Sequence, residues 1–90
     1  MIHENDKQYL AEFSAVAGDV LVSRADADVH QLLLFDACKQ EAQRRGSEWM
    51  PMSTFFRLLS ATGFEHRARR RRFLGIDVRY RYRPQRIPRD

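Results

Sequence analysis

The sequence predicts an α+β fold in which three helices precede a C-terminal β-hairpin, with one short strand between the first two helices. Three observations lead to this prediction. The chain has 90 residues, enough for one domain. Its first two thirds repeat apolar residues with the period of a helix. After Gly63 the period changes to two, which is typical of strands buried on one face.

The first predicted helix covers residues 6–17. Its apolar residues fall at i, i+1, i+4, i+7 and i+8, and they are Tyr9, Leu10, Phe13, Val16 and Ala17. We expect Asn5 or Asp6 to cap its start and Gly18 to end it. Residues 20–22, Val-Leu-Val, are too few for a helix and predict one short strand.

The second predicted helix covers residues 27–45. Asp26 and Asp28 are candidate N-caps, two arginines lie in the last turn, and Gly46 follows directly. Acidic residues at the start, basic residues at the end and a glycine after the end are the usual signals of helix boundaries. This segment therefore carries the strongest helix signals of the chain.

The third predicted helix begins at Pro51 or is capped by Ser53, and it ends at Gly63. An apolar stripe faces the core at i, i+3, i+4 and i+7, made of Phe55, Leu58, Leu59 and Thr62. The opposite face presents Thr54, Arg57, Ser60 and Ala61. Trp49, in the preceding connection, is expected to fill the space between the second and third helices.

Two alternating segments predict the hairpin. Phe64, His66 and Ala68 alternate with charged residues in the first strand, and the turn falls on the arginines at 69–72. The inward residues of the second strand are expected to be Leu74, Ile76, Val78, Tyr80 and Tyr82. Pro84 ends strand pairing, so a domain over residues 1–83 and a loose basic tail over 84–90 are predicted.

Charge is strongly polarised along the chain. Residues 1–63 carry nine acidic and six basic residues, whereas residues 64–90 carry ten arginines, no lysine and three acidic residues. The net charge thus changes from −3 to +7 between the two parts, which indicates one surface directed at an anionic partner.

Other function classes lack their signals. Cys38 is the only cysteine, so an internal disulfide and a cysteine-based zinc site are excluded, and the three histidines have no metal-ligand spacing. There is no glycine-rich phosphate loop, nucleophile elbow or carboxylate pair, so we expect neither an enzyme nor a cofactor. No apolar run approaches the length of a membrane span, and no signal peptide is present, which predicts a soluble cytoplasmic protein without a membrane partner.

The order helix, strand, helix, helix, hairpin is that of a winged helix, in which the third helix enters the major groove and the hairpin forms the wing. The stretch PMSTFFRLLSATGFEHRARRRRFLGIDV, residues 51–78, resembles the C-terminal winged-helix domain of phage and plasmid primase-helicases. The matching positions are Ser53, Phe55, Arg57, Leu59, Gly63, Phe64, the basic residues at 67–72, Leu74, Gly75 and Ile76. The resemblance implies DNA binding without catalysis, in the replication or regulation of a mobile element.

The sequence therefore predicts a nucleic-acid-binding module. Its candidate contacts are Thr54, Arg57, Ser60, Arg67, Arg69, Arg70, Arg71, Arg72, Arg79 and Arg81. Arginine suits this function because its planar fork binds phosphate or guanine bidentately. Duplex DNA is the favoured partner, single strands are a second one, and a larger replication protein or self-association is a further option. The alternative hypothesis is a protein-interaction module whose basic face meets an acidic partner surface.

Overall fold

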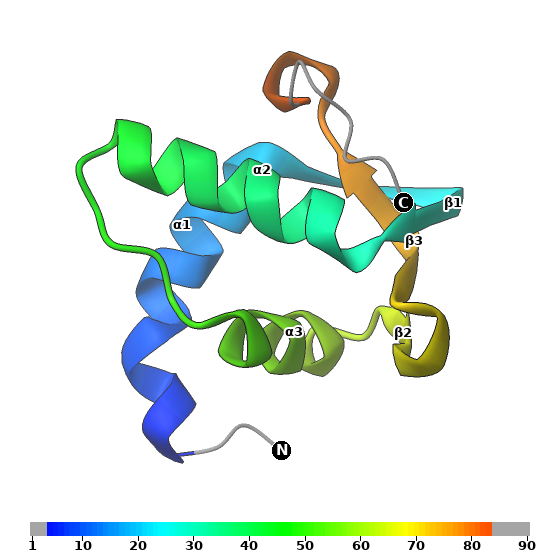
Figure 1. Ribbon diagram of the computed structural model, residues 1–90, viewed down its shortest axis with the longest axis horizontal. Helices are drawn as coiled ribbons and strands as arrows, with labels where there is room; N and C mark the ends of the chain where they lie inside the picture. The colour runs from blue at the N-terminus through cyan, green and yellow to red at the C-terminus, as the bar shows by residue number, and fades with distance from the viewer. Residues whose placement is uncertain (1–3, 84–90) are drawn as a thin grey trace.

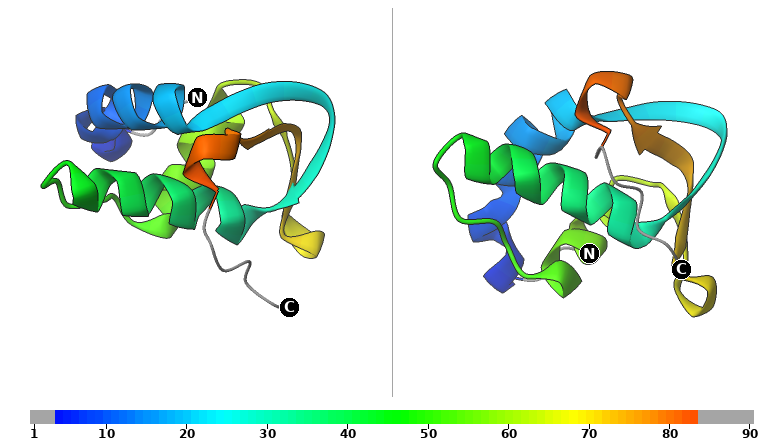
Figure 2. Two further views of the ribbon diagram at one scale, coloured as in Figure 1. Left: turned by 90° about the horizontal axis from the view of Figure 1, so that it is seen from above. Right: turned by 45° about the horizontal axis from the view of Figure 1, so that its top comes forward.

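The computed structural model describes residues 4–83, in which three helices pack beside a three-stranded antiparallel sheet (Figures 1 and 2). The helices are α1 (Leu10–Val20), α2 (Gln31–Arg44) and α3 (Met52–Ala61). The strands are β1 (Leu21–His30), β2 (Glu65–Arg67) and β3 (Arg72–Val78), and their order in the sheet is β1-β3-β2. The predicted α+β class is confirmed. The predicted tail over 84–90 lies outside the described residues.

The first helix differs from its prediction at both ends. A 3-10 helix, η1 (Glu4–Tyr9), precedes α1, and neither Asn5 nor Asp6 caps α1, whose N-cap is Tyr9. Gly18 does not end the helix. Val20 follows Val16 by four residues, so continuing the helix to Val20 buries its side chain completely on the face that already packs in the core.

The long strand β1 occupies residues that were predicted as a short strand and a helix start. The predicted strand at 20–22 begins one residue later and continues to His30, so α2 begins at Gln31 rather than near Ala27. Asp28, Val29 and His30 pair with β3 across the sheet, and this long-range ladder overrides the local capping signals. The cap of α2 is His30, whose ring Nδ1 accepts a hydrogen bond from the Leu32 amide at 3.1 Å.

The ends of α2 and α3 follow the sequence signals more closely. Gly46 has a φ of 80° after α2, and the Ser47 amide donates to the carbonyl of Ala42 at 2.9 Å, which closes the helix as predicted. In α3, three residues of the predicted stripe are buried, but Thr62 is exposed at the C-cap and Thr54 is buried instead.

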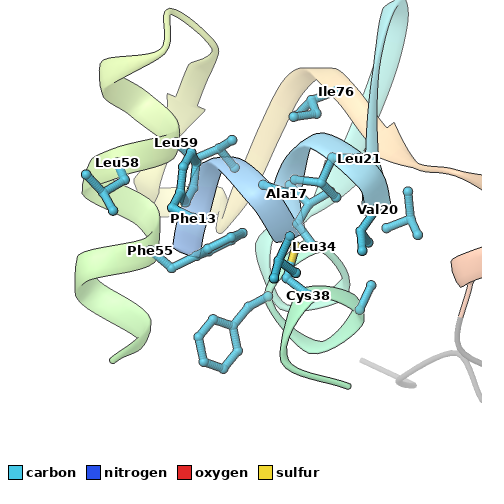
Figure 3. Close-up of a cluster of buried hydrophobic side chains, with 14 of the residues drawn as sticks. Phe13, Ala17, Val20, Leu21, Leu34, Cys38, Phe55, Leu58, Leu59 and Ile76 are labelled. Atoms are coloured by element: carbon cyan, nitrogen blue, oxygen red, sulfur yellow. The ribbon is translucent and has the colours of Figure 1, made fainter. Parts of the chain in front are cut away.

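Phe55 of α3 is at the centre of the core, where it is completely buried. Its ring centroid lies 5.7 Å from that of Phe13, 5.6 Å from Phe35 and 5.9 Å from Trp49. Figure 3 shows Phe13 and Phe55 among the buried side chains between α1, α2 and α3, with Ile76 of β3 nearby. Tilted aromatic contacts of this kind stabilise a core beyond the burial of area alone. Trp49, predicted to fill the space between the second and third helices, is partly buried and packs against Phe55 of α3.

The hairpin is confirmed, but only some of the residues that were predicted to face the core do so. Gly75 has a φ of 83°, and residues 24–27 of β1 form an irregularity opposite it, between the pairs Ser23 with Ile76 and Asp28 with Leu74. Phe73 is therefore fully buried while Leu74 is half-buried, and Ile76 and Val78 are buried as expected.

The second hairpin strand is also shorter than predicted. β3 ends at Val78, and the chain then forms a 3-10 turn, η3 (Tyr80–Tyr82), which carries the two tyrosines out of the sheet. Tyr80 is exposed and Tyr82 is half-buried against the core, so the prediction that both continue the inward phase is wrong. The last ladder pair of the sheet is Leu21 with Val78. The sequence continues to alternate after Val78, but the backbone is no longer paired as a strand, so the alternation no longer predicts which side chains face the core.

Candidate nucleic-acid interface

The tip of the hairpin is a tight turn that displays arginines. Ala68–Arg70 form a 3-10 turn, η2, and the Arg71 amide donates to the Ala68 carbonyl at 3.1 Å. Arg71 is the only non-glycine residue with positive φ in residues 4–83, at 58°. The left-handed conformation costs an L-residue about 1 kcal/mol, so the backbone alone gives no reason for an arginine at this position.

The side chains of Arg69, Arg70 and Arg71 are exposed. Within residues 4–83, none of the three takes part in an ion pair or a side-chain hydrogen bond. Three positive charges thus lie on consecutive residues of one turn, and no carboxylate of residues 4–83 neutralises them. We call these three residues the arginine tip.

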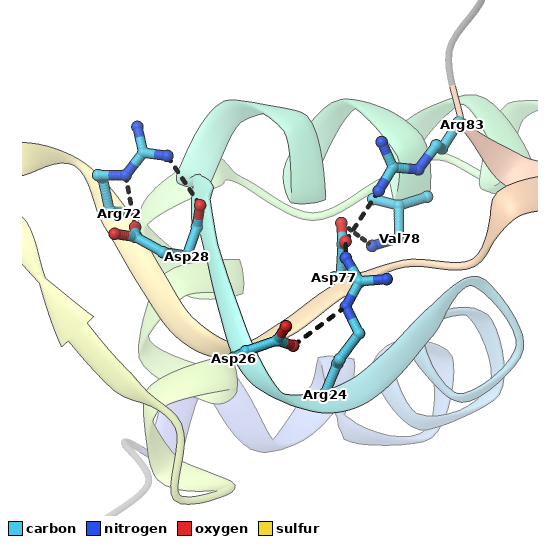
Figure 4. Close-up of polar contacts among 7 residues, drawn as sticks. All are labelled: Arg24, Asp26, Asp28, Arg72, Asp77, Val78 and Arg83. Carbon is cyan, nitrogen blue, oxygen red and sulfur yellow. Dashed lines mark hydrogen bonds and ion pairs between the residues drawn. The ribbon is translucent and has the colours of Figure 1, made fainter.

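The two arginines that flank the tip are bound to acidic residues. Arg67 donates from Nε to the carboxylate of Glu65 at 2.8 Å, and this hydrogen bond raises the pKa of Arg67. Arg72 belongs to β3 rather than to the predicted turn. It donates to the Asp28 carboxylate at 2.5 Å and to the Asp28 carbonyl at 2.8 Å, as Figure 4 shows. Arg72 therefore connects the turn end of the hairpin to β1.

His66, in the middle of the hairpin ladder, also supports the hairpin. Its ring stacks on the ring of Phe73, with centroids 4.1 Å apart and an interplanar angle of 2°, and its Nε2 lies 2.8 Å from Oε1 of Gln31. Burial lowers the pKa of His66, which favours the neutral ring in this position. The alternation of Phe64, His66 and Ala68 placed His66 on the inner face, but no sequence signal indicated the stacking partner.

The three candidates on α3 lie in different environments. Thr54 is 4% exposed and faces the core, whereas Ser60 is exposed. Arg57 donates from Nε and Nη2 to the two carboxylate oxygens of Asp6, at 2.8 and 3.0 Å, and this pairing raises the pKa of Arg57. Since Arg57 is the only charged residue of α3, the helix carries one cation, and that cation is already bound to an acid.

A shallow groove runs between α3 and β2. Ser53, Phe56, Arg57, Ser60, Ala61 and His66 line it. The groove places the exposed side of α3 next to the hairpin, and the ring of Phe56 lies 5.7 Å from that of His66. The arrangement offers hydroxyl groups and one paired guanidinium to a ligand beside α3. At the tip it offers three guanidinium groups that have no partner in the described part of the chain.

Arg79 and Arg81 lie far from the other candidates. They flank Tyr80 at η3, and η3 and η2 are at opposite ends of β3 (Figure 1). The predicted site residues thus form two groups in the structure. One group lies on the hairpin and α3, and the other lies at η3. Arg81 places its guanidinium carbon 5.1 Å from the ring centroid of Tyr82.

The structure contains a cluster of ion pairs around Asp77 that the sequence did not predict. The alternation of residue types had placed Asp77 on the solvent-exposed face of the strand. Asp77 is 1% exposed and pairs with Arg24 and with Arg83, the latter at 2.8 Å (Figure 4). Its other oxygen accepts a hydrogen bond from the Val78 amide at 2.7 Å. Arg24 belongs to the irregular part of β1, so the partner could not be inferred from the spacing.

Residues 4–83 carry no features of a metal site, a reactive thiol or a membrane span. This part of the chain holds no group of three or more His, Cys, Asp or Glu side chains that could bind a metal ion. Burial raises the pKa of the Cys38 thiol to about 12, which makes it unreactive at neutral pH. None of the helices that the structure describes is long and apolar enough to cross a membrane.

Comparisons with protein-family models, with curated proteins and with solved structures found no match for the chain.

Proposed function

We propose that this chain is a winged-helix module that binds the phosphate backbone of duplex DNA through the arginine tip. Two features support the winged-helix assignment. The elements follow one another as helix, strand, helix, helix, strand and strand, with the sheet order β1-β3-β2, and Phe56 of α3 lies beside His66 of the hairpin. In such a fold the hairpin is the wing, and η2 is the end of the wing.

The observation that carries the proposal is the absence of acidic partners at the tip among the described residues. Arg24, Arg57 and Arg83 bind buried carboxylates, but Arg69, Arg70 and Arg71 do not. An exposed guanidinium group without a partner is free to form charge-assisted, bidentate hydrogen bonds with a phosphate. Three of them on one turn match the closely spaced charges of a nucleic-acid backbone.

The role of α3 in this proposal is smaller than the sequence suggested. Arg57 uses Nε and Nη2 for its hydrogen bonds to Asp6, so only part of its guanidinium group remains for a phosphate or base, and Thr54 is buried. Ser60 and Ser53 are the remaining polar groups beside the groove. We therefore infer that contacts between the wing and the DNA phosphates supply most of the affinity, and that α3 contributes little recognition of the bases. A role in the replication of a phage or plasmid, which the family resemblance implies, stays a prediction.

The test is a titration of the chain against a random-sequence DNA duplex at low salt, followed by fluorescence anisotropy. We expect replacement of Arg69, Arg70 and Arg71 by alanine to weaken binding at least tenfold, and replacement by lysine to retain most of it, because the charge is kept. A variant with Lys7→Ala and Lys39→Ala, which removes two positive charges, is the control for loss of charge elsewhere, since both lysines are exposed and outside the hairpin. It should bind within about twofold of the unmodified chain.

Two outcomes would overturn the proposal. One is equal affinity of the alanine variant and the unmodified chain. The other is failure of the unmodified chain to bind duplex DNA at low salt. Binding of polyglutamate by the same arginines in the second case would support the alternative hypothesis, in which the basic surface meets an acidic protein.

A further inference from the structure

Tyr80 is an aromatic residue with almost no contact to the rest of the fold. Its exposed fraction is 91%, and the other large apolar residue exposed in residues 4–83 is Met52, at 40%. The η3 turn directs Tyr80 away from the core while Tyr82, two residues later, packs against it. An exposed aromatic ring offers a flat apolar face that a ligand can cover.

The turn that carries Tyr80 is fixed at both ends. The Arg79 amide donates to the carbonyl of Val20 at 2.8 Å, and the Tyr82 amide donates to the carbonyl of Arg79 at 2.9 Å. Arg83 pairs with the buried carboxylate of Asp77. The backbone on each side of Tyr80 is therefore held in place, so a ligand that stacks on the ring would not have to order the turn first.

The residues next to Tyr80 in the chain are positively charged. Arg79 and Arg81 are its neighbours in the chain, both are exposed, and neither has an acidic partner among the residues that the structure describes. A hollow between α2 and η3 lies beside this turn, and it is lined by Ala37, Gln40, Glu41, Arg44, Arg81, Tyr82 and Arg83. Glu41, the acid in this hollow, already pairs with Arg44 and Arg45.

We propose that η3 is a second nucleic-acid site, at which the Tyr80 ring stacks on an unpaired base of a single strand. Arg79 and Arg81 would bind the phosphates on either side of that base. An aromatic ring among cations is the usual way in which proteins hold single strands without sequence preference. A duplex does not suit the ring, because its bases already stack on one another.

This site is separate from the arginine tip and does not depend on it. The seven residues of β3 lie between them, a distance of roughly 20 Å at the rise of a strand. The two sites also differ in composition, since the tip has guanidinium groups without an aromatic ring, whereas η3 combines two of them with Tyr80. The different compositions suit a duplex backbone and an unpaired base, respectively.

The experiment compares a labelled oligothymidylate with a DNA duplex for Tyr80→Ala, Tyr80→Phe and the alanine variant of the tip. We expect Tyr80→Ala to weaken oligothymidylate binding by about 5- to 100-fold, the usual loss for one stacking side chain. Tyr80→Phe should bind within about twofold of the unmodified chain, because the ring is kept. Neither change should alter duplex binding or the melting temperature, because Tyr80 is exposed. Photocrosslinking to an oligonucleotide that contains iodouracil should label Tyr80.

The outcomes separate the two sites. Unchanged oligothymidylate affinity in Tyr80→Ala, or no binding of this oligonucleotide by the unmodified chain, would overturn the proposal for η3. Loss of oligothymidylate binding in Tyr80→Ala, together with no duplex binding by any variant, would support η3 and overturn the proposed function of the tip. A crosslink confined to the hairpin would assign single-strand binding to the wing and contradict a site at η3.

Discussion

Two groups of arginines in this small fold are in opposite electrostatic situations. Arg24, Arg57 and Arg83 each bind a carboxylate that is almost completely buried, either Asp77 or Asp6. The arginine tip has no acidic partner among residues 4–83. An arginine that binds a buried carboxylate contributes to the fold, and an arginine without a partner is available to a ligand. A high content of arginine therefore predicts the location of a site only after the structural arginines have been identified.

The largest effect on stability is expected at the centre of the structural group. Asp77→Ala removes two ion pairs and leaves the amide of Val78 without its side-chain acceptor. We expect a loss of about 3 kcal/mol in the free energy of unfolding, measured by urea denaturation. Asp77→Asn keeps an acceptor and should lose less. Equal stability of Asp77→Ala and the unmodified chain would show that the cluster does not hold the C-terminal end of the sheet.

Arg57 tests the distinction between structural and ligand-binding arginines directly. The sequence predicted that it contacts DNA, whereas the structure shows it bound to Asp6. Arg57→Ala should lower the free energy of unfolding by about 2 kcal/mol, since the buried Asp6 loses two hydrogen bonds from a charged donor. Duplex affinity should change by less than about twofold. A large loss of affinity with little loss of stability would instead place Arg57 among the DNA contacts.

Glu41 provides a test by pH. Hydrogen bonds from Arg44 and Arg45 hold the pKa of Glu41 at about 2, below its ordinary value of 4.5. The folded chain thus binds this proton less readily than the unfolded chain, so the stabilisation is complete above about pH 4.5 and is lost as the pH falls toward 2.

After allowance for solvent around the two arginines, the contribution of Glu41 is about 1 kcal/mol. Glu41→Gln should be less stable at neutral pH and should show a weaker loss of stability between pH 4.5 and 2, measured by urea denaturation at each pH. The same loss in Glu41→Gln as in the unmodified chain would assign the acid sensitivity to other carboxylates.

The smallest expected effect on stability is a gain, whereas the substitutions described above lower the stability. Arg71 has a φ of 58°, where glycine has no steric penalty. Arg71→Gly should therefore leave the melting temperature unchanged or raise the free energy of unfolding by up to about 1 kcal/mol, while it weakens duplex binding. Arg71→Ala keeps the backbone penalty and removes the same charge, so it is the matched variant. Tighter duplex binding by Arg71→Gly would contradict a functional role for this side chain.

The sequence was sufficient to predict elements whose signals are local. The helical period, Gly46 and the change of period after Gly63 predicted the three helices and the hairpin. The sequence was insufficient to predict the conformation of segments that depend on a partner far away in the chain. Pairing with β3 converts the predicted start of the second helix into strand, and Gly75 shifts the alternation so that Phe73 replaces Leu74 in the core.

The same reason explains the limits of the predicted site. Asp6 and Arg57 are 51 positions apart, and Arg24 and Asp77 are 53 positions apart, so neither pairing could be inferred from spacing. The arginine run itself was visible, and its position at a hairpin turn followed from the alternation on both sides. Tyr80 was assigned to the core because its residue type continued that alternation, whereas β3 had already ended at Val78.

The central claim is that the arginine tip neutralises phosphates, and the salt dependence of duplex binding tests it most directly. Each phosphate that a cation neutralises contributes about −0.9 to the slope of log affinity against log salt concentration. The alanine variant of Arg69, Arg70 and Arg71 should therefore have a slope about 2.7 less negative than the unmodified chain. Equal slopes for the two proteins would contradict the claim, even if both bind DNA.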